Sequence, residues 1–267
     1  MDYSQIAREI RKKVLKMFFD SQTAHLGSSL SEIDILTVLY FKILSIDPKN
    51  PMAEDRDRFL LSKGHGAAGL YATLAQRGFF PEAVLDTYCQ DGGKLPGHST
   101  KGCAPGVEVS TGSLGHGLPM GAGMALAGKR DGKDYRVFVL MSDGECEEGS
   151  VWEAALFAAH HKLDNLVVIV DRNWWQAFGK TEEILQLEPL EDKFIAFHWN
   201  VQRINGHDFQ ALEKSLTNLS AQKPNIIIAD TIKGKGLPCY EDKLESHYSN
   251  LNKKQYEEAI RYIDQQR

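Results

Sequence analysis

The fold is decided by residues 136–173, RVFVLMSDGECEEGSVWEAALFAAHHKLDNLVVIVDRN, in which two apolar runs flank an amphipathic segment. The runs RVFVLM and LVVIVD are apolar throughout, which is typical of strands that are buried on both faces of a parallel sheet. Between them, apolar residues recur at helical spacing and predict a helix that packs on the sheet. These residues are Trp152, Ala155, Leu156 and Ala159. The stretch therefore predicts a strand, a helix and a parallel strand.

Further segments extend this unit along the chain. The runs RFLL, NVQRI and PNIIIADT predict strands, and the segments GLPMGAGMALAG and DFQALEKSLTNL predict helices. We therefore expect an α/β fold with a doubly wound, mainly parallel sheet and helices on both faces. Residues 1–267 are expected to form a single domain with helical extensions at the N- and C-terminal ends. Ligands of such sheets bind beyond the carboxyl ends of the strands.

Two other regions carry clear local signals. Apolar residues at helical spacing predict a helix over residues 3–20, and a second helix is expected near Ser29, which forms a capping-box pattern with Glu32. Residues 90–113, QDGGKLPGHSTKGCAPGVEVSTGS, contain too many Gly, Pro and Ser residues for regular structure. An irregular stretch of this length inside a compact domain is usually functional.

Composition excludes several classes of function. The net charge is -5, and Lys and Arg are scattered among Asp and Glu, so we expect neither a nucleic-acid-binding face nor a polybasic membrane anchor. No signal-peptide pattern is present, and no apolar run approaches the roughly 20 residues of a membrane span. The 4 cysteines lie far apart without a CxxC pair, which favours reduced thiols in a cytoplasmic protein.

Two polar residues follow the central strands. Asp143 comes after the strand that ends at Met141, and Asn173 comes after the strand that ends at Val170. Both side chains should lie at the carboxyl edge of the sheet, where a carboxylate and an amide oxygen suit a hard cation such as Mg²⁺ or Ca²⁺. Gly144 permits close approach of a phosphate to the backbone. Taken in isolation, both residues could equally be ordinary turn residues.

The spacing of these residues resembles the thiamine diphosphate signature GDG…N of the transketolase family, with 28 residues (145–172) between Gly144 and Asn173. The resemblance implies that Asp143, Asn173 and the carbonyl of Trp175 bind Mg²⁺, which carries the diphosphate of the cofactor and which Ca²⁺ or Mn²⁺ can replace. Ser142 stands where the family usually has the first Gly of the signature. Trp175 replaces a leucine-type residue, so its indole could reshape the pocket and alter acceptor specificity.

Four further segments resemble family motifs in the same order along the chain. They are TAHLGSSLSEIDIL with His25, LSKGHGAAGLY with His65, LPGHSTKGCAPGVEVSTGSLGHGL with His98, and DTIKGKG…ESHYS with His247. The resemblance implies that His25 and His98 face the sugar, that His65 contacts the diphosphate and that His247 completes the active site. It also implies that the backbone of Gly112, Ser113 and Leu114 binds the cofactor. Imidazoles suit proton exchange with sugar hydroxyls near neutral pH.

The helix after Asp143 allows two interpretations of its acidic residues. By resemblance, Glu148 and Glu153 belong to a carboxylate network that links active sites across a dimer, and Glu148 also counts as a catalytic and cofactor-binding candidate. Ser150 and Glu153 also form a capping-box pattern, which explains Glu153 equally well. Glu145 and Glu147 are expected on a solvated face.

Three histidines and a row of small residues have less defined roles. His116 replaces the usual Gln of its motif and could touch the pocket, whereas His160 and His161 should only favour the C-terminal dipole of their helix. The small residues Gly117, Gly121 and Ala125 could mark a helix contact within or between subunits.

These features predict the diphosphate-binding half of a transketolase that transfers a two-carbon ketol unit between sugars or sugar phosphates. No pyrimidine-binding domain is recognisable in residues 1–267, so we expect a separate C-terminal subunit to supply one, in an α2β2 heterotetramer. Two alternatives stay open: a noncatalytic thiamine diphosphate-binding subunit or sensor, and the α subunit of a 2-oxo acid dehydrogenase. A nucleotide-binding domain is disfavoured because no GxGxxG follows the first strand.

Overall fold

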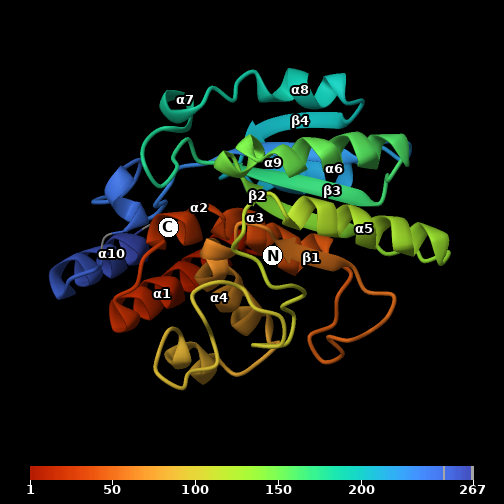
Figure 1. The fold of residues 1–267 in the computed structure, drawn as a ribbon. Helices are drawn as coiled ribbons and strands as arrows, with labels where there is room; N and C mark the ends of the chain where they lie inside the picture. Colours follow the sequence, from red (N-terminus) through yellow and green to blue (C-terminus); the bar gives the residue numbers. More distant parts are fainter. Residues whose placement is uncertain (249, 266–267) are drawn as a thin grey trace.

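The apolar runs form a single parallel sheet. The computed structural model describes residues 1–248 and 250–265. Within them, five strands lie in the order β1, β2, β3, β5, β4, and each neighbouring pair is parallel (Figure 1). Their bounds are β1 Arg58–Leu61, β2 Val137–Ser142, β3 Leu166–Arg172, β4 Asn200–Asn205 and β5 Asn225–Asp230. The expected parallel α/β sheet is confirmed.

Helices cover both faces of the sheet, because alternate residues of a strand enter two separate cores. In β2, Phe138 and Leu140 enter one core, whereas Val137 and Val139 enter the other. The first core holds residues of α1 Tyr3–Ser21, α2 Leu26–Ser31, α3 Ile33–Val38, α4 Ala67–Arg77, α9 Phe209–Thr217 and α10 Lys253–Gln265. The second core holds residues of α5 Gly117–Arg130, α6 Gly149–His160 and α8 Leu190–Ala196 (Figure 1).

Short helices and one long loop surround the carboxyl ends of the strands. The short elements that follow strands are η2 Gly64–Gly66, η4 Gly144–Glu147, α7 Thr181–Ile184 and η5 Leu244–His247; η1 Leu39–Ile43 and η3 Glu82–Thr87 lie elsewhere. Residues 90–113, all of which are described, contain no helix and no extended strand, as expected. Thr111 Oγ1 donates to Leu61 O at 2.7 Å, which fixes the end of this loop to the end of β1.

The capping box expected at Ser29 and Glu32 is wrong. The helix begins earlier, at Leu26, and Ser29 lies buried inside it. Glu32 separates α2 from α3, and its carboxylate lies 3.1 Å from Lys63 Nζ in the protein interior. A tertiary ion contact therefore takes the side chain that the local pattern assigns to a helix N-terminus.

The capping box expected at Ser150 and Glu153 is also wrong. The N-cap of α6 is Glu148, and Ser150 Oγ donates to Gly115 O at 2.7 Å. Glu153 is exposed, and so is Leu156, which the helical pattern placed on the buried stripe. The sheet-facing side of α6 is therefore formed by small residues, whereas part of its apolar surface faces outward.

Both ends of the described chain join one core. Ala259 and Ile263 of α10 lie in the same core as α1, so the terminal helices pack together on the domain. In the described part of the chain, no helix is long and apolar enough to cross a membrane. The cysteines are unpaired, and of these Cys146 is buried and Cys239 is exposed.

Candidate active site

A cavity of about 370 Å³ lies where β2 and β3 end. The predicted site residues that line it are His25, His65, His98, Gly112, Leu114, Asp143, Gly144, Glu148, Asn173, Trp175 and His247. Ser113 is exposed beside Gly112 and is not part of the lining. Ser28, Gln176 and Phe178 also line the cavity, although no motif assigned them a role. Segments that are distant in sequence thus meet at one place.

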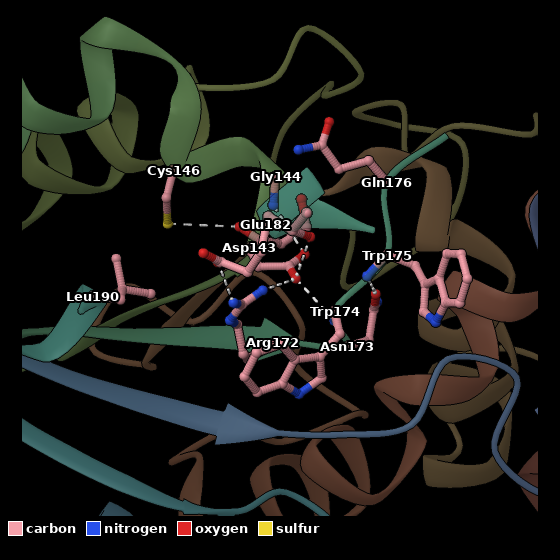
Figure 2. Close-up of polar contacts among 12 residues, drawn as sticks. Asp143, Gly144, Cys146, Arg172, Asn173, Trp174, Trp175, Gln176, Glu182 and Leu190 are labelled. Carbon is pink, nitrogen blue, oxygen red and sulfur yellow. Dashed lines mark hydrogen bonds and ion pairs between the residues drawn. The ribbon is translucent and has the colours of Figure 1, made fainter. Parts of the chain in front are cut away.

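Asp143 is held firmly at the edge of this cavity. Its side chain is buried, and Oδ1 accepts a hydrogen bond from Gly144 N at 2.9 Å (Figure 2). Oδ2 accepts from Arg172 Nη1 at 2.7 Å and from Trp174 N at 2.9 Å. Burial raises the pKa of the Asp143 carboxyl, and the charge of Arg172 opposes that rise. The carboxylate therefore has a fixed orientation before any ligand binds.

Asn173 and Trp175 add further oxygen atoms beside Asp143. Asn173 Oδ1 accepts from Trp175 N at 3.2 Å, and the indole of Trp175 donates to Asp242 Oδ1 at 2.7 Å. A carboxylate, an amide oxygen and a backbone carbonyl are donors that fit a hard divalent cation. Among the described residues, no group of three or more His, Cys, Asp or Glu side chains could hold a metal, so a cation here would depend on this mixed oxygen set.

Four histidine rings meet in the cavity. The centroid of His25 lies 5.4 Å from those of His65 and His98, and 5.0 Å from that of His247. Burial, with the nearby charges, lowers the pKa of His25 to about 4 and that of His247 to about 3. Burial also holds the pKa of His65 well below its usual value. At pH 7 these three rings are neutral, and each offers one donor and one acceptor.

Lys233 is a candidate that the motifs did not reveal. Its buried Nζ donates to Gln176 O at 3.1 Å and lies 3.0 Å from His247 Nδ1. Burial lowers the pKa of this amine to about 8, and Asp143 acts in the opposite direction. Both hydrogen-bond partners are neutral, so its charge is available to an anionic ligand. The only sequence signal was the first Lys of KGKG, which by itself is more typical of a solvated loop.

The solvated face expected at Glu145 is wrong. Its side chain is fully buried and accepts hydrogen bonds from Ser62 Oγ and from Gly115 N, the latter at 2.9 Å. The carboxylate thus joins the ends of β1 and β2 to the segment after Gly112, which no local pattern could indicate. Glu147 is partly buried and accepts from Gln176 Nε2.

The remaining predicted positions are less informative. Glu148 is exposed at the cavity, and its place in a carboxylate network across a dimer stays a prediction. His116 Nδ1 lies 3.0 Å from Leu114 O, and the residue is not part of the cavity lining. His160 and His161 lie at the C-terminal end of α6, as expected, with ring centroids 4.9 Å apart.

Comparison with protein families gives one match over nearly the whole chain. Residues 3–263 match the family model described as "Transketolase, thiamine diphosphate binding domain". A subunit of the apulose-4-phosphate transketolase of Phocaeicola vulgatus is 42% identical over 96% of this chain and 91% of the relative. The 6-deoxy-6-sulfo-D-fructose transketolase subunit SqwG of Clostridium sp. is 41% identical over 100% of this chain and 98% of the relative.

Solved structures show the same arrangement. The transketolase of Leishmania mexicana superimposes with a TM-score of 0.91 at 30% identity, covering 98% of this chain and 41% of that chain. The transketolase of Campylobacter jejuni gives a TM-score of 0.91 at 32% identity, covering 97% of this chain and 43% of that chain. The chain thus spans about two fifths of the transketolases of known structure, but nearly all of the relatives that are named as subunits.

Proposed function

The chain belongs to the transketolase family, whose thiamine diphosphate-binding domain it matches, and we propose that it is one subunit of a two-subunit, Mg²⁺-dependent transketolase. The enzyme would transfer a two-carbon ketol unit from a ketose or ketose phosphate to an aldose or aldose phosphate. The observation that carries this proposal is the single cavity shared by Asp143, Asn173 and the four histidines.

The cavity has groups for both parts of a diphosphate cofactor complex. Asp143, Asn173 and the carbonyl of Trp175 would hold the cation, and His65 and Lys233 would donate hydrogen bonds to the diphosphate. The segment Gly112–Leu114 borders the same space and would support the cofactor through its backbone. When bound, thiamine diphosphate supplies a thiazolium ring that acts as an electron sink for the two-carbon unit.

The histidine cluster would move protons at the sugar hydroxyls. His25 and His247 are neutral at pH 7, so a ring nitrogen of either can accept a proton from a hydroxyl. The resulting imidazolium would lie about 5 Å from other imidazoles and near Lys233, which disfavours the charged form. The proton would therefore be returned readily to the product. His98 would orient the substrate from the loop of residues 90–113.

A separate C-terminal subunit with a pyrimidine-binding domain is proposed as the partner. Two relatives are named as subunits, and this chain covers 91% and 98% of them, whereas it covers only 41% of the transketolase of Leishmania mexicana. Phe178 lines the cavity with 83% of its surface exposed, as expected of a side chain that a partner covers. We propose an α2β2 heterotetramer that acts in carbohydrate metabolism in the cytoplasm, in which the unpaired cysteines would stay reduced.

A reconstitution experiment tests this function. The chain is purified with the product of a neighbouring gene that encodes a pyrimidine-binding domain, and ketol transfer between sugar phosphates is measured. Turnover that requires both proteins, thiamine diphosphate and Mg²⁺ is the expected result. Cofactor binding without turnover would favour a noncatalytic subunit or sensor, and dependence on a lipoyl acceptor would favour a 2-oxo acid dehydrogenase.

A variant of the metal site provides a second test. Asp143→Ala removes the only charged ligand of the proposed set, so Mg²⁺-dependent binding of thiamine diphosphate should be lost. Circular dichroism and calorimetry of the assembled protein measure the fold and the cofactor affinity separately. Unchanged affinity in a folded variant would show that the cation binds elsewhere.

A further inference from the structure

Arg172 is a buried cation at the edge of the cavity for which the motifs provide no role. It is the last residue of β3, directly before Asn173, and its side chain is fully buried. Besides its bond to Asp143, Nη2 donates to Glu182 Oε1 at 2.7 Å, and Nε donates to Glu188 Oε1 at 3.2 Å. Two acidic residues of the following loop thus fix the guanidinium at its far side.

An aromatic ring fixes the guanidinium from a third direction. The carbon at its centre lies 3.9 Å from the centroid of the Trp174 indole, which stacks beside it (Figure 2). Trp174 has a φ of 72°, a strained conformation for a residue with a side chain. That conformation allows Trp174 to donate its own N–H to Asp143 while its ring covers Arg172. The guanidinium is therefore held rigidly on the side that faces Asp143.

The two oxygens of Asp143 differ in their free capacity for a ligand. Oδ2 accepts three hydrogen bonds, from Arg172 Nη1 at 2.7 Å, Trp174 N at 2.9 Å and Thr181 Oγ1 at 3.0 Å. Oδ1 accepts one hydrogen bond, from Gly144 N at 2.9 Å. Because a carboxylate oxygen has about two lone-pair sites, Oδ2 is saturated and Oδ1 keeps one site.

We propose that Arg172 is a positioning residue that occupies Oδ2 of Asp143 and so restricts this carboxylate to binding a divalent cation through Oδ1 alone. The inference rests on the proposed function, which places the cation beside Asp143. Mg²⁺ requires a near-ideal octahedron, whereas Ca²⁺ takes six to eight oxygens and accepts both oxygens of one carboxylate. Arg172 therefore favours Mg²⁺ over Ca²⁺ at this site.

Arg203 provides a matched control in the same cluster. It donates to Asp230 Oδ1 and Oδ2 at 2.9 and 2.8 Å and to Glu188 Oε2 at 3.3 Å. Its guanidinium also faces the Trp174 ring, with 5.7 Å to the centroid. Arg203 thus shares an acidic and an aromatic partner with Arg172, but its hydrogen bonds go to residues other than Asp143. Replacing it perturbs the surrounding loop without freeing Oδ2.

The test compares the affinities of Mg²⁺ and Ca²⁺ in the presence of thiamine diphosphate, measured by calorimetry on the protein assembled with its partner. In Arg172→Met, we expect Mg²⁺ binding to weaken by about 10- to 100-fold, the usual effect of removing a group that orients a metal ligand. Ca²⁺ binding should weaken less, so the ratio of the two affinities shifts towards Ca²⁺. Arg172→Lys, which retains one charged donor, should restore most of the preference for Mg²⁺.

Several outcomes would overturn the role of Arg172. One is an unchanged ratio of affinities in Arg172→Met, including an equal loss for both cations, which is what general damage to the loop would produce. Another is an equal shift in Arg203→Met. If Arg172→Met does not fold, Thr181→Val removes a neutral donor from the same oxygen and should shift the ratio in the same direction by a smaller factor. Unmodified protein that binds thiamine diphosphate without any divalent cation would instead refute the proposed function.

Discussion

Glu32→Gln is expected to stabilise the protein increasingly as the pH rises, because Glu32 belongs to a buried cluster with too few positive charges. Lys63 Nζ lies 3.1 Å from Glu32 Oε2, forms an ion pair with Asp171 and donates to Ser28 O at 2.8 Å. The side chains of Glu32, Lys63 and Asp171 are all fully buried. One cation thus faces two carboxylates in a region that water does not reach, which favours a proton on one of them.

Glu32 is the carboxyl that keeps the proton. Asp171 also accepts hydrogen bonds from Ser31 Oγ at 2.5 Å and from Thr231 Oγ1, and against the effect of burial these contacts and Lys63 lower its pKa. Glu32 has only the contact with Lys63 among the described residues, and burial raises its pKa from 4.5 to about 8 despite that contact. Asp171 is therefore the ionised partner of Lys63 near neutral pH.

The sign of the effect follows from proton binding. Below about pH 4.5 the Glu32 carboxyl is protonated in both the folded and the unfolded chain, so Gln and Glu are nearly equivalent. Between pH 4.5 and 8 only the folded chain keeps the proton, and the free energy of unfolding of the wild type falls as the pH rises. At about 1.4 kcal/mol per pKa unit, the advantage of Gln reaches roughly 3–5 kcal/mol above pH 8.

Urea unfolding of both proteins at several pH values between 5 and 9 measures this difference. Glu153→Gln is the control, because Glu153 is exposed and its substitution should give a difference that does not depend on pH. The reasoning is refuted if Glu32→Gln is less stable than the wild type at pH 8. That result would mean that Glu32 is ionised and contributes an ion pair with Lys63, whose loss costs about 3–5 kcal/mol.

Two further predictions concern packing and protonation. In Gly117→Ala the new Cβ would lie 2.0 Å from Ser62 Oγ and 2.9 Å from Ser62 Cα, so we expect a loss of about 1–3 kcal/mol in thermal or urea unfolding. Gly123→Ala in the same helix meets nothing within 4 Å and should instead stabilise by about 0.5–1 kcal/mol. Nuclear magnetic resonance of labelled histidine should show His25 and His247 neutral at pH 6, with midpoints near 4 and 3; a midpoint near 6.5 for either ring would contradict the effect of burial.

The sheet and its functional edge could be predicted from the sequence because they depend on local patterns. Continuous apolar runs identify buried parallel strands, and the first polar residue after each run lies at the carboxyl edge. Asp143 and Asn173 followed directly from this rule. The histidines were found only through the resemblance to a family, since their spacing along the chain contains no local geometry.

The predictions that failed, and the residues that were missed, depend on contacts between distant segments. Glu145 bonds Ser62, which is 83 residues away, and Lys63 pairs with Asp171, which is 108 residues away. A periodicity or capping rule compares residues within one turn of a helix and cannot register such partners. Where a buried charge competes with a local cap, as at Glu32, the tertiary contact is stronger because the interior offers no water as an alternative.

The same charges explain why the cavity suits an anion. Asp143 is paired with Arg172, and Asp171 is paired with Lys63, so these groups contribute little net charge. Lys233 has hydrogen bonds only to neutral partners among the described residues, and its lowered pKa shows that its charge is held there at a cost. A diphosphate bound with its cation would lie in the field of Lys233 and relieve that cost. The energy stored in an unpaired buried amine would thus become available for binding the cofactor.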